Sequence, residues 1–402
     1  MRYVLGLERS GDGKIPAHVE VRDTDHQHEV VTSHAMPNQQ TIEREYTPTG
    51  ILSLKDNRLL VGTKFGLVQF QDKTLIQFPS LVEGSKPLDA LVAQYAKDTV
   101  TDDGSCSCTF AVAEGITYWL PTLHVGICRY QKAVGLFQLA GTTLERLADK
   151  ENVVGPLLSV GDALVYYVER DSLSTQRKGV LYSYTRSAFH VSRREADLFS
   201  SELFRKPVAL CTDGKDIYSV STQDTEAEIS QFSPTLALKK QTRISLDEIA
   251  DVTAFAVFKV SYVRPEIPGM PGVQFSVHPE KTYALIGGST GNLALVDMET
   301  SRLVAKLNIR DNELKEHIGE RQYVKNILVA QKADDDDAQV LVQYSNATVF
   351  MRASELLTTA FYLSSHGDHS ALLVASGYTQ SFRNNPRVAY FPTSITCSGV
   401  VP

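Results

Sequence analysis

Residues 59–70 read LLVGTKFGLVQF, in which two runs of apolar, strand-forming residues flank a short turn that contains glycine. The same phrase returns at residues 284–297, which read ALIGGSTGNLALVD. Val, Leu, Ile and Phe favour strands, and glycine reaches the positive φ angles of a tight turn without steric cost. Each stretch therefore predicts a β-hairpin.

Weaker copies of this phrase recur along the chain. They are marked by Gly115, Gly161, Gly214, Ser345 and Gly377. When the two clear copies are included, the spacing between successive copies centres on about 50 residues. One four-stranded propeller blade with its loops requires this length. The repeat crosses every plausible domain boundary, so we expect residues 1–402 to form a single domain.

These glycine-containing hairpins resemble those of the β-propeller superfamily, of the WD-repeat and citron-homology kind. The chain has one tryptophan, so no Trp-Asp dipeptide recurs and the resemblance is to the architecture alone. It implies an all-β fold, a single β-propeller of about seven four-stranded blades. The last unit is incomplete, while residues 3–7 and 18–21 read as strands without a blade. We therefore expect the N- and C-terminal strands to share one blade, which closes the ring. A pair of β-sandwiches is the structural alternative.

Charge and composition exclude several classes of protein. The formal net charge is −7 and the basic residues are scattered, whereas direct binding of nucleic acid needs a concentrated basic face. No apolar stretch is long enough to span a bilayer, and the N-terminus carries charge too early for a signal peptide. The five cysteines lack the spacing of a disulfide framework. We expect a soluble, cytoplasmic protein.

Four segments depart from the repeat and read as short helical insertions. Residues 85–97 and 192–204 are amphipathic, residues 311–320 are rich in charge, and residues 353–363 begin with a helix-favouring run. Each helix packs its apolar face on its own sheets or presents that face to a partner protein; the sequence leaves both alternatives open.

Two further segments are candidates for binding a partner protein. The loop 263–272 contains three prolines and apolar tips, and such a stiff loop loses little entropy on docking; alternatively it covers one end of the central channel. An acidic run at 334–337 follows a predicted strand and reads as a hairpin tip that could bind a basic partner. The predicted partner-binding residues are Arg264, Ile267, Met270, Asp334, Asp335, Asp336 and Asp337.

One stretch has the composition of a metal site. His366, Asp368 and His369 are two histidines and a carboxylate within four residues, which could coordinate zinc or a similar metal. A polar turn before a strand uses the same residue types, and only proximity in the fold could add the histidines of the segment 26–34. No catalytic motif, phosphate loop or dinucleotide fingerprint is present. We therefore predict no catalytic residue and no cofactor.

The sequence supports two hypotheses of function. The first is a non-catalytic scaffold or adaptor subunit that binds one or more proteins within a cytoplasmic complex, because the repeat carries insertions and no catalytic signature. The alternative is a metal- or small-molecule-dependent propeller enzyme or sensor with its site in the central channel, assembled from residues of several blades.

Overall fold

The structure of the protein is a computed structural model that describes part of the chain. The described ranges are 1–36, 47–53, 58–63, 66–71, 74–77, 80–81, 119–120, 125–130, 133–140, 143–148, 153–160, 163–169, 179–185, 198–223, 225–246, 249–263, 277–307, 323–330, 337–357, 388–391 and 393–400. Within them almost all regular structure is β-strand. The helical parts of these ranges are the 3₁₀ turn η1 (Thr24–His26) and residues 353–357.

The strands of these ranges form seven sheets. One sheet combines both ends of the chain, in the order β29 (Ile395–Val400), β1 (Arg2–Leu7), β2 (His18–Asp23) and β3 (Glu29–Ala35). The next contains β4 (Pro48–Ser53), β5 (Arg58–Thr63), β6 (Gly66–Gln71) and β7 (Thr74–Gln77). A five-stranded sheet follows, in the order β8 (Ser80–Leu81), β12 (Thr143–Ala148), β11 (Ala133–Ala140), β10 (Val125–Tyr130) and β9 (Trp119–Leu120).

The remaining four sheets each use four consecutive strands. They are β13 (Val153–Val160), β14 (Ala163–Glu169), β15 (Gly179–Thr185) and β16 (Leu198–Leu203); β17 (Ala209–Thr212), β18 (Ile217–Gln223), β19 (Glu226–Phe232) and β20 (Leu238–Ser245); β21 (Val252–Val263), β22 (Val277–Gly288), β23 (Leu293–Asp297) and β24 (Arg302–Leu307); and β25 (Asn326–Ala330), β26 (Gln339–Gln343), β27 (Ala347–Arg352) and β28 (Val388–Tyr390). Apart from the parallel pair of β8 and β12, the pairs described are antiparallel. The all-β class predicted from the sequence is confirmed.

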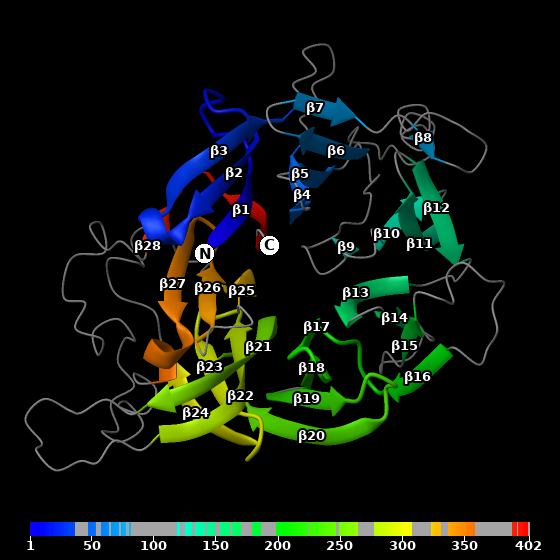
Figure 1. Cartoon of the computed structure of the whole chain (residues 1–402), viewed down its shortest axis with the longest axis vertical. Coiled ribbons are helices and arrows are strands. Elements are labelled where there is room, and N and C mark those ends of the chain that lie inside the picture. Colours follow the sequence, from blue (N-terminus) through cyan, green and yellow to red (C-terminus); the bar gives the residue numbers. More distant parts are fainter. Residues whose placement is uncertain are drawn as a thin grey trace, which may run out of the picture.

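The sheets follow one another around the molecule in chain order, and both termini lie near its middle (Figure 1). The first strands of successive sheets contact one another, as β13 with β17, β17 with β21 and β21 with β25. The C-terminal strand β29 contacts both β25 and β4, and it pairs with β1 from Tyr3 opposite Val400 to Leu7 opposite Ile395. The two termini therefore share one sheet, as the sequence predicted.

The buried core lies between consecutive sheets. Because side chains alternate across a strand, Phe258 and Leu285 pack toward the sheet β25–β28, while their neighbours Val257 and Ala284 pack toward the sheet β17–β20. Equivalent clusters join the sheet of the two termini to the sheets on either side of it, and the sheet β13–β16 to the sheet β17–β20. Each sheet with described side chains thus buries apolar residues against a neighbour, which stabilises the sheets as one unit.

Both hairpins predicted from the sequence are present. Strand β5 pairs with β6 up to Thr63 opposite Gly66, and β22 pairs with β23 up to Gly287 opposite Leu293. In the second hairpin glycine supplies the positive φ of the turn, as predicted, and a second glycine allows a close approach. The positive φ of that turn belongs to Gly291, at 84°. At Gly288 a Cβ atom would lie 2.1 Å from Ile249 Cγ2 and 2.3 Å from its carbonyl oxygen, so this position requires glycine for close approach.

The helix predicted at residues 192–204 is wrong over its described part. Residues 198–203 form strand β16, which pairs with β15 from Tyr184 opposite Leu198 to Gly179 opposite Leu203. The predicted insertions 85–97 and 311–320 lie outside the described residues, as does the loop 263–272 apart from Val263. Of the segment 353–363, residues 353–357 are described and helical.

Replacing Gly288 tests the close approach. We expect Gly288→Ala to lower the free energy of unfolding by about 1–3 kcal/mol, because the added methyl group meets the backbone of Ile249 and one of the two segments must shift. Urea denaturation followed by circular dichroism measures the change. Gly11→Ala is the matched control, since its Cβ would meet nothing within 4 Å. Equal midpoints for the two variants would contradict the packing described above.

Candidate interaction surface

Most of the site residues predicted from the sequence lie outside the described residues. This holds for Arg264, Ile267, Met270, Asp334, Asp335, Asp336, His366, Asp368 and His369. Asp337 is described. Its Oδ1 accepts a hydrogen bond from the backbone N–H of Ser354 at 2.9 Å, and its Oδ2 accepts one from the Ser354 hydroxyl at 2.6 Å. This carboxylate therefore holds the beginning of the helical residues 353–357.

The N-terminal histidines lie in different surroundings. His26 is exposed, with Nδ1 3.2 Å from Asp23 Oδ2. His28 is buried, and its Nδ1 lies 2.7 Å from the hydroxyl of Tyr3; burial raises the pKa of Tyr3 to about 12. His34 stacks on Phe70, with 4.8 Å between the ring centroids. Within the described ranges, no three His, Cys, Asp or Glu side chains are grouped so as to hold a metal ion.

The pKa values of two histidines near the N-terminus, His18 and His34, are shifted in opposite directions. Burial lowers the pKa of His34, a residue of β3 whose ring stacks on Phe70 of β6. A hydrogen bond to Glu20 raises the pKa of His18, with Nε2 3.2 Å from Glu20 Oε1. The folded state therefore favours the neutral form of His34 and the protonated form of His18.

These shifts predict a dependence of stability on pH. Below the ordinary histidine pKa, His34 becomes protonated in the unfolded chain but stays neutral in the folded chain, because its folded-state pKa is lower. The unfolded state then binds more protons, so His34 makes the free energy of unfolding fall as the pH is lowered. His34→Phe should therefore lose less stability than the wild type between pH 7.5 and 5.5, in urea denaturation. His18→Gln should lose more, because the His18 contribution is present below the unfolded pKa and is lost as the pH rises through the folded pKa. Identical pH slopes in the three proteins would contradict this assignment.

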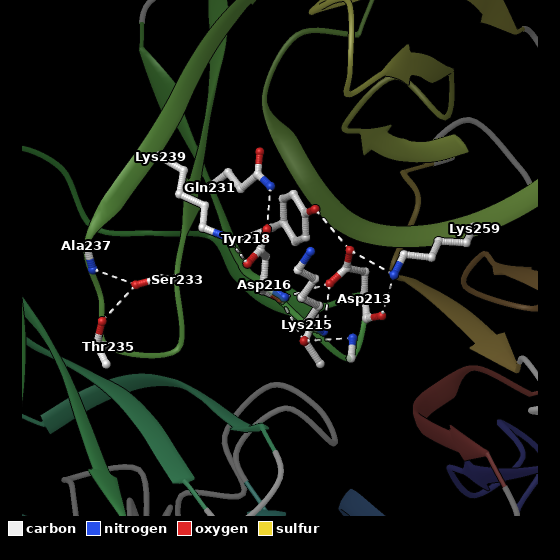
Figure 2. A network of polar contacts seen from close by, with 12 residues as sticks. Asp213, Lys215, Asp216, Tyr218, Gln231, Ser233, Thr235, Ala237, Lys239 and Lys259 are labelled. Atoms are coloured by element: carbon white, nitrogen blue, oxygen red, sulfur yellow. Dashed lines mark hydrogen bonds and ion pairs between the residues drawn. The ribbon is translucent and has the colours of Figure 1, made fainter. Parts of the chain in front are cut away.

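A network of polar contacts surrounds the turn between β17 and β18 (Figure 2). Asp213 Oδ1 accepts hydrogen bonds from the backbone N–H groups of Lys215 at 2.9 Å and Asp216 at 2.7 Å, the geometry that favours aspartate in turns. Its Oδ2 lies 3.3 Å from both Lys259 Nζ and the Tyr218 hydroxyl. Burial alone would raise the pKa of Asp213, but these hydrogen bonds and the Lys259 charge hold it below its usual value.

Asp216 extends the network to the neighbouring hairpin. It is 5% exposed; its Oδ1 lies 2.5 Å from Lys239 Nζ, and its Oδ2 accepts a hydrogen bond from Gln231 Nε2 at 2.7 Å. Gln231 belongs to β19 and Lys239 to the beginning of β20. The carboxylates of Asp213 and Asp216 thus bind donors from the protein itself. The network therefore holds the strands in position and has a structural role.

The connection between β19 and β20 is fixed by its own hydrogen bonds (Figure 2). The Ser233 hydroxyl accepts a hydrogen bond from the backbone N–H of Ala237 at 3.1 Å and lies 2.9 Å from the Thr235 hydroxyl. Leu236 adopts a φ of 59° and is buried. Leu238, two residues further on, is 55% exposed, so the buried and exposed leucines point to different sides.

Leu238 lies in a groove between the end of β16 and strands β19 and β20. The groove has a volume of about 340 Å³. Its lining also includes the apolar residues Leu203, Phe204 and Phe232 and an equal number of basic and acidic residues, Arg205, Arg243, Glu202 and Glu228. Phe204 is 69% exposed, and among the described residues it and Leu238 are the two most exposed large apolar side chains. Sequence reasoning singled out neither residue: Phe204 is the last residue of the predicted segment 192–204, and Leu238 stands in no motif.

Comparison with known proteins identifies no family. No family model matches the chain, and no curated protein matches it either. Solved structures do match over most of the chain. The computationally designed Ika8 protein is 10% identical, with 84% of this chain and 78% of that chain covered and a TM-score of 0.42. The AfRom2 CNH domain is 12% identical, with 76% and 67% covered and a TM-score of 0.33. BBS1N, in complex with ARL6DN, is 10% identical, with 81% and 84% covered and a TM-score of 0.39.

In the part of the chain that the structure describes, there is no helix with the length and apolar character needed to cross a bilayer.

Removing the Asp216 carboxylate tests the structural role of the network. We expect Asp216→Ala to lower the free energy of unfolding by about 1–3 kcal/mol, since Gln231 and the half-exposed Lys239 lose their acceptor. Thermal and urea denaturation measure the loss. Asp12→Ala is the matched control, because that carboxylate is 54% exposed and contacts only its own loop. A loss no larger than that of the control would contradict the role given to Asp216.

Proposed function

We propose that the chain is a β-propeller of seven blades, closed by the pairing of β29 with β1, and that it acts as a non-catalytic scaffold that binds other proteins in a cytoplasmic complex. The sheets follow in chain order, and consecutive sheets share buried apolar clusters, which supports the propeller. A rigid ring of this kind presents its edges and loops to partners.

The observation that carries the binding role is the groove beside β16. Phe204 and Leu238 are the two most exposed large apolar side chains described, and both line this one groove. Exposed apolar patches on a protein surface often mark sites of interaction with other molecules, because covering them removes apolar surface from water. The volume of about 340 Å³ lies within the range of binding pockets.

The described polar groups favour binding over catalysis. Asp213 and Asp216 are occupied by lysines, backbone donors and Gln231. The alternative of a metal-dependent enzyme or sensor depends on His366, Asp368 and His369, which lie outside the described residues.

Co-purification from the native cell tests the proposal. We expect the tagged wild-type protein to carry stoichiometric partner proteins, and the double variant Phe204→Ser, Leu238→Ser to lose at least one of them. Both side chains are mostly exposed, so the variant should keep the thermal midpoint of the wild type. Leu303→Ser on β24 is the matched control, since Leu303 is also exposed and lies on another sheet. A wild-type protein that purifies alone would overturn the proposed function.

A further inference from the structure

We infer that the junction between the sheet of the two termini and the sheet β25–β28 is a pH-sensitive contact, in which the protonated ring of His18 fixes Glu20 and Arg22 and thereby the contact of Arg22 with Phe391. Loss of the His18 proton near neutral pH loosens this contact. The device is independent of the proposed scaffold function, because it concerns how firmly two neighbouring sheets are held together.

Strand β2 has a polar face and an apolar face. Because side chains alternate along a strand, His18, Glu20 and Arg22 share one face. Val19 and Val21 lie on the other and pack in the cluster that joins this sheet to the sheet β4–β7. The β1 residues opposite the three polar ones belong to the cluster shared with the sheet β25–β28. The polar side chains of β2 therefore face that second junction.

The surroundings of His18 require a proton on each ring nitrogen. Nδ1 lies 2.8 Å from the carbonyl oxygen of Pro16, and Nε2 lies 3.2 Å from Glu20 Oε1. A carbonyl and a carboxylate oxygen only accept hydrogen bonds, and both ring nitrogens donate only in the imidazolium form. The side chains of His18 and Glu20 are each 13% exposed, so salt and water screen their contact little.

Glu20 and Arg22 connect His18 to the next sheet. Glu20 Oε2 accepts hydrogen bonds from Arg22 Nε at 2.7 Å and Nη2 at 2.6 Å. Arg22 donates from Nη1 to the carbonyl of His28 at 2.8 Å, and its guanidinium carbon lies 4.7 Å from the centroid of the Phe391 ring. Phe391 is buried and directly follows β28. Arg22 thus makes a cation–π contact from one sheet to the other.

Deprotonation of His18 weakens this chain of contacts. If the remaining proton stays on Nδ1, the lone pair of Nε2 faces Glu20 Oε1. If it stays on Nε2, the lone pair of Nδ1 faces the Pro16 carbonyl. Either contact is repulsive, and a neutral ring holds the Glu20 carboxylate less strongly than an imidazolium does. Glu20 and Arg22 are then held less firmly, so the contact with Phe391 weakens.

The strands packed against His18 contribute two further titratable groups at this junction. The residues directly opposite His18 are Leu7 on β1 and Ala35 on β3, and neither is charged. Further along, the hydroxyl of Tyr3 lies 2.7 Å from His28 Nδ1. Tyr3 has a pKa of about 12 and does not titrate near neutral pH. His28 is therefore the group whose titration has to be separated from that of His18.

The direction of the pH effect follows from the charges around His18. The hydrogen bond to Glu20 raises the pKa of His18 above its ordinary value of 6.5, against the smaller opposing effects of burial and of the Arg22 charge. The contribution of a group with a raised folded-state pKa is complete below its unfolded pKa and is lost as the pH rises through the folded pKa. The junction is therefore tightest in mildly acidic solution.

Hydrogen exchange followed by mass spectrometry tests the inference on the full chain. Exchange is measured at about pH 6 and about pH 8, on either side of the range in which histidine titrates, and is corrected for the intrinsic effect of pH on the exchange rate. We expect the protection of residues 388–391 to fall several-fold between the lower and the higher pH. Residues 284–297, on another sheet, should keep their protection.

Three variants separate His18 from its neighbours. His18→Gln should abolish the pH response of residues 388–391. Arg22→Met should abolish it there as well, while residues 17–20 still respond, because the titrating group remains and the connection is cut. His26→Gln is the matched control, since the His26 side chain is 71% exposed, and it should respond as the wild type does. Protection of residues 284–297 shows that each variant is folded.

Three results would overturn the inference. The first is a wild-type protection of residues 388–391 that does not change with pH. The second is a pH response that persists in His18→Gln, which would assign it to His28. The third is a response that is lost in His18→Gln but kept in Arg22→Met, since the effect would then reach Phe391 by another route. Co-purification of partner proteins tests the scaffold function separately from all three.

Discussion

The pairing of β29 with β1 is the constraint on which the arrangement of the sheets depends. It joins residues at opposite ends of a 402-residue chain, and the entropy cost of such a closure grows only slowly with the length of the loop. Strand β29 also contacts β4 and β25, the first strands of the sheets on either side. Without it, the cluster that contains Tyr3, Leu5 and Ile395 would lose one wall. A single strand thus completes two interfaces between sheets.

The sequence predicted the parts of the fold that depend on local chemistry. The hairpins at 59–70 and 284–297 are short-range, so turn residues and strand propensity suffice to find them. The strand at 198–203 was missed because its apolar residues also fit one face of a helix. The segment Leu198–Leu203 forms a strand because it pairs with the edge of β15 through a ladder of backbone hydrogen bonds. Pairing with the preceding strand overrides local propensity there.

The candidate site could be predicted only in part for the same reason. The turn at Asp213 has a readable signal, an aspartate followed by Gly214 with a φ of 87°. The contact of Asp216 with Lys239 does not, because it joins residues from two different hairpins of the sheet. Phe204 follows β16 and is 69% exposed, and its exposure depends on contacts with other segments, which the sequence of its own segment does not encode.

The network and the groove are connected through β20. Asp216 fixes Lys239, the residue that follows Leu238, and the buried Leu236 anchors the connection on the other side of it. Leu238 is therefore held between two fixed neighbours, exposed but restrained. A binding surface that is ordered before its ligand arrives loses little conformational entropy on binding, and the ordering cost of association then falls on the ligand alone.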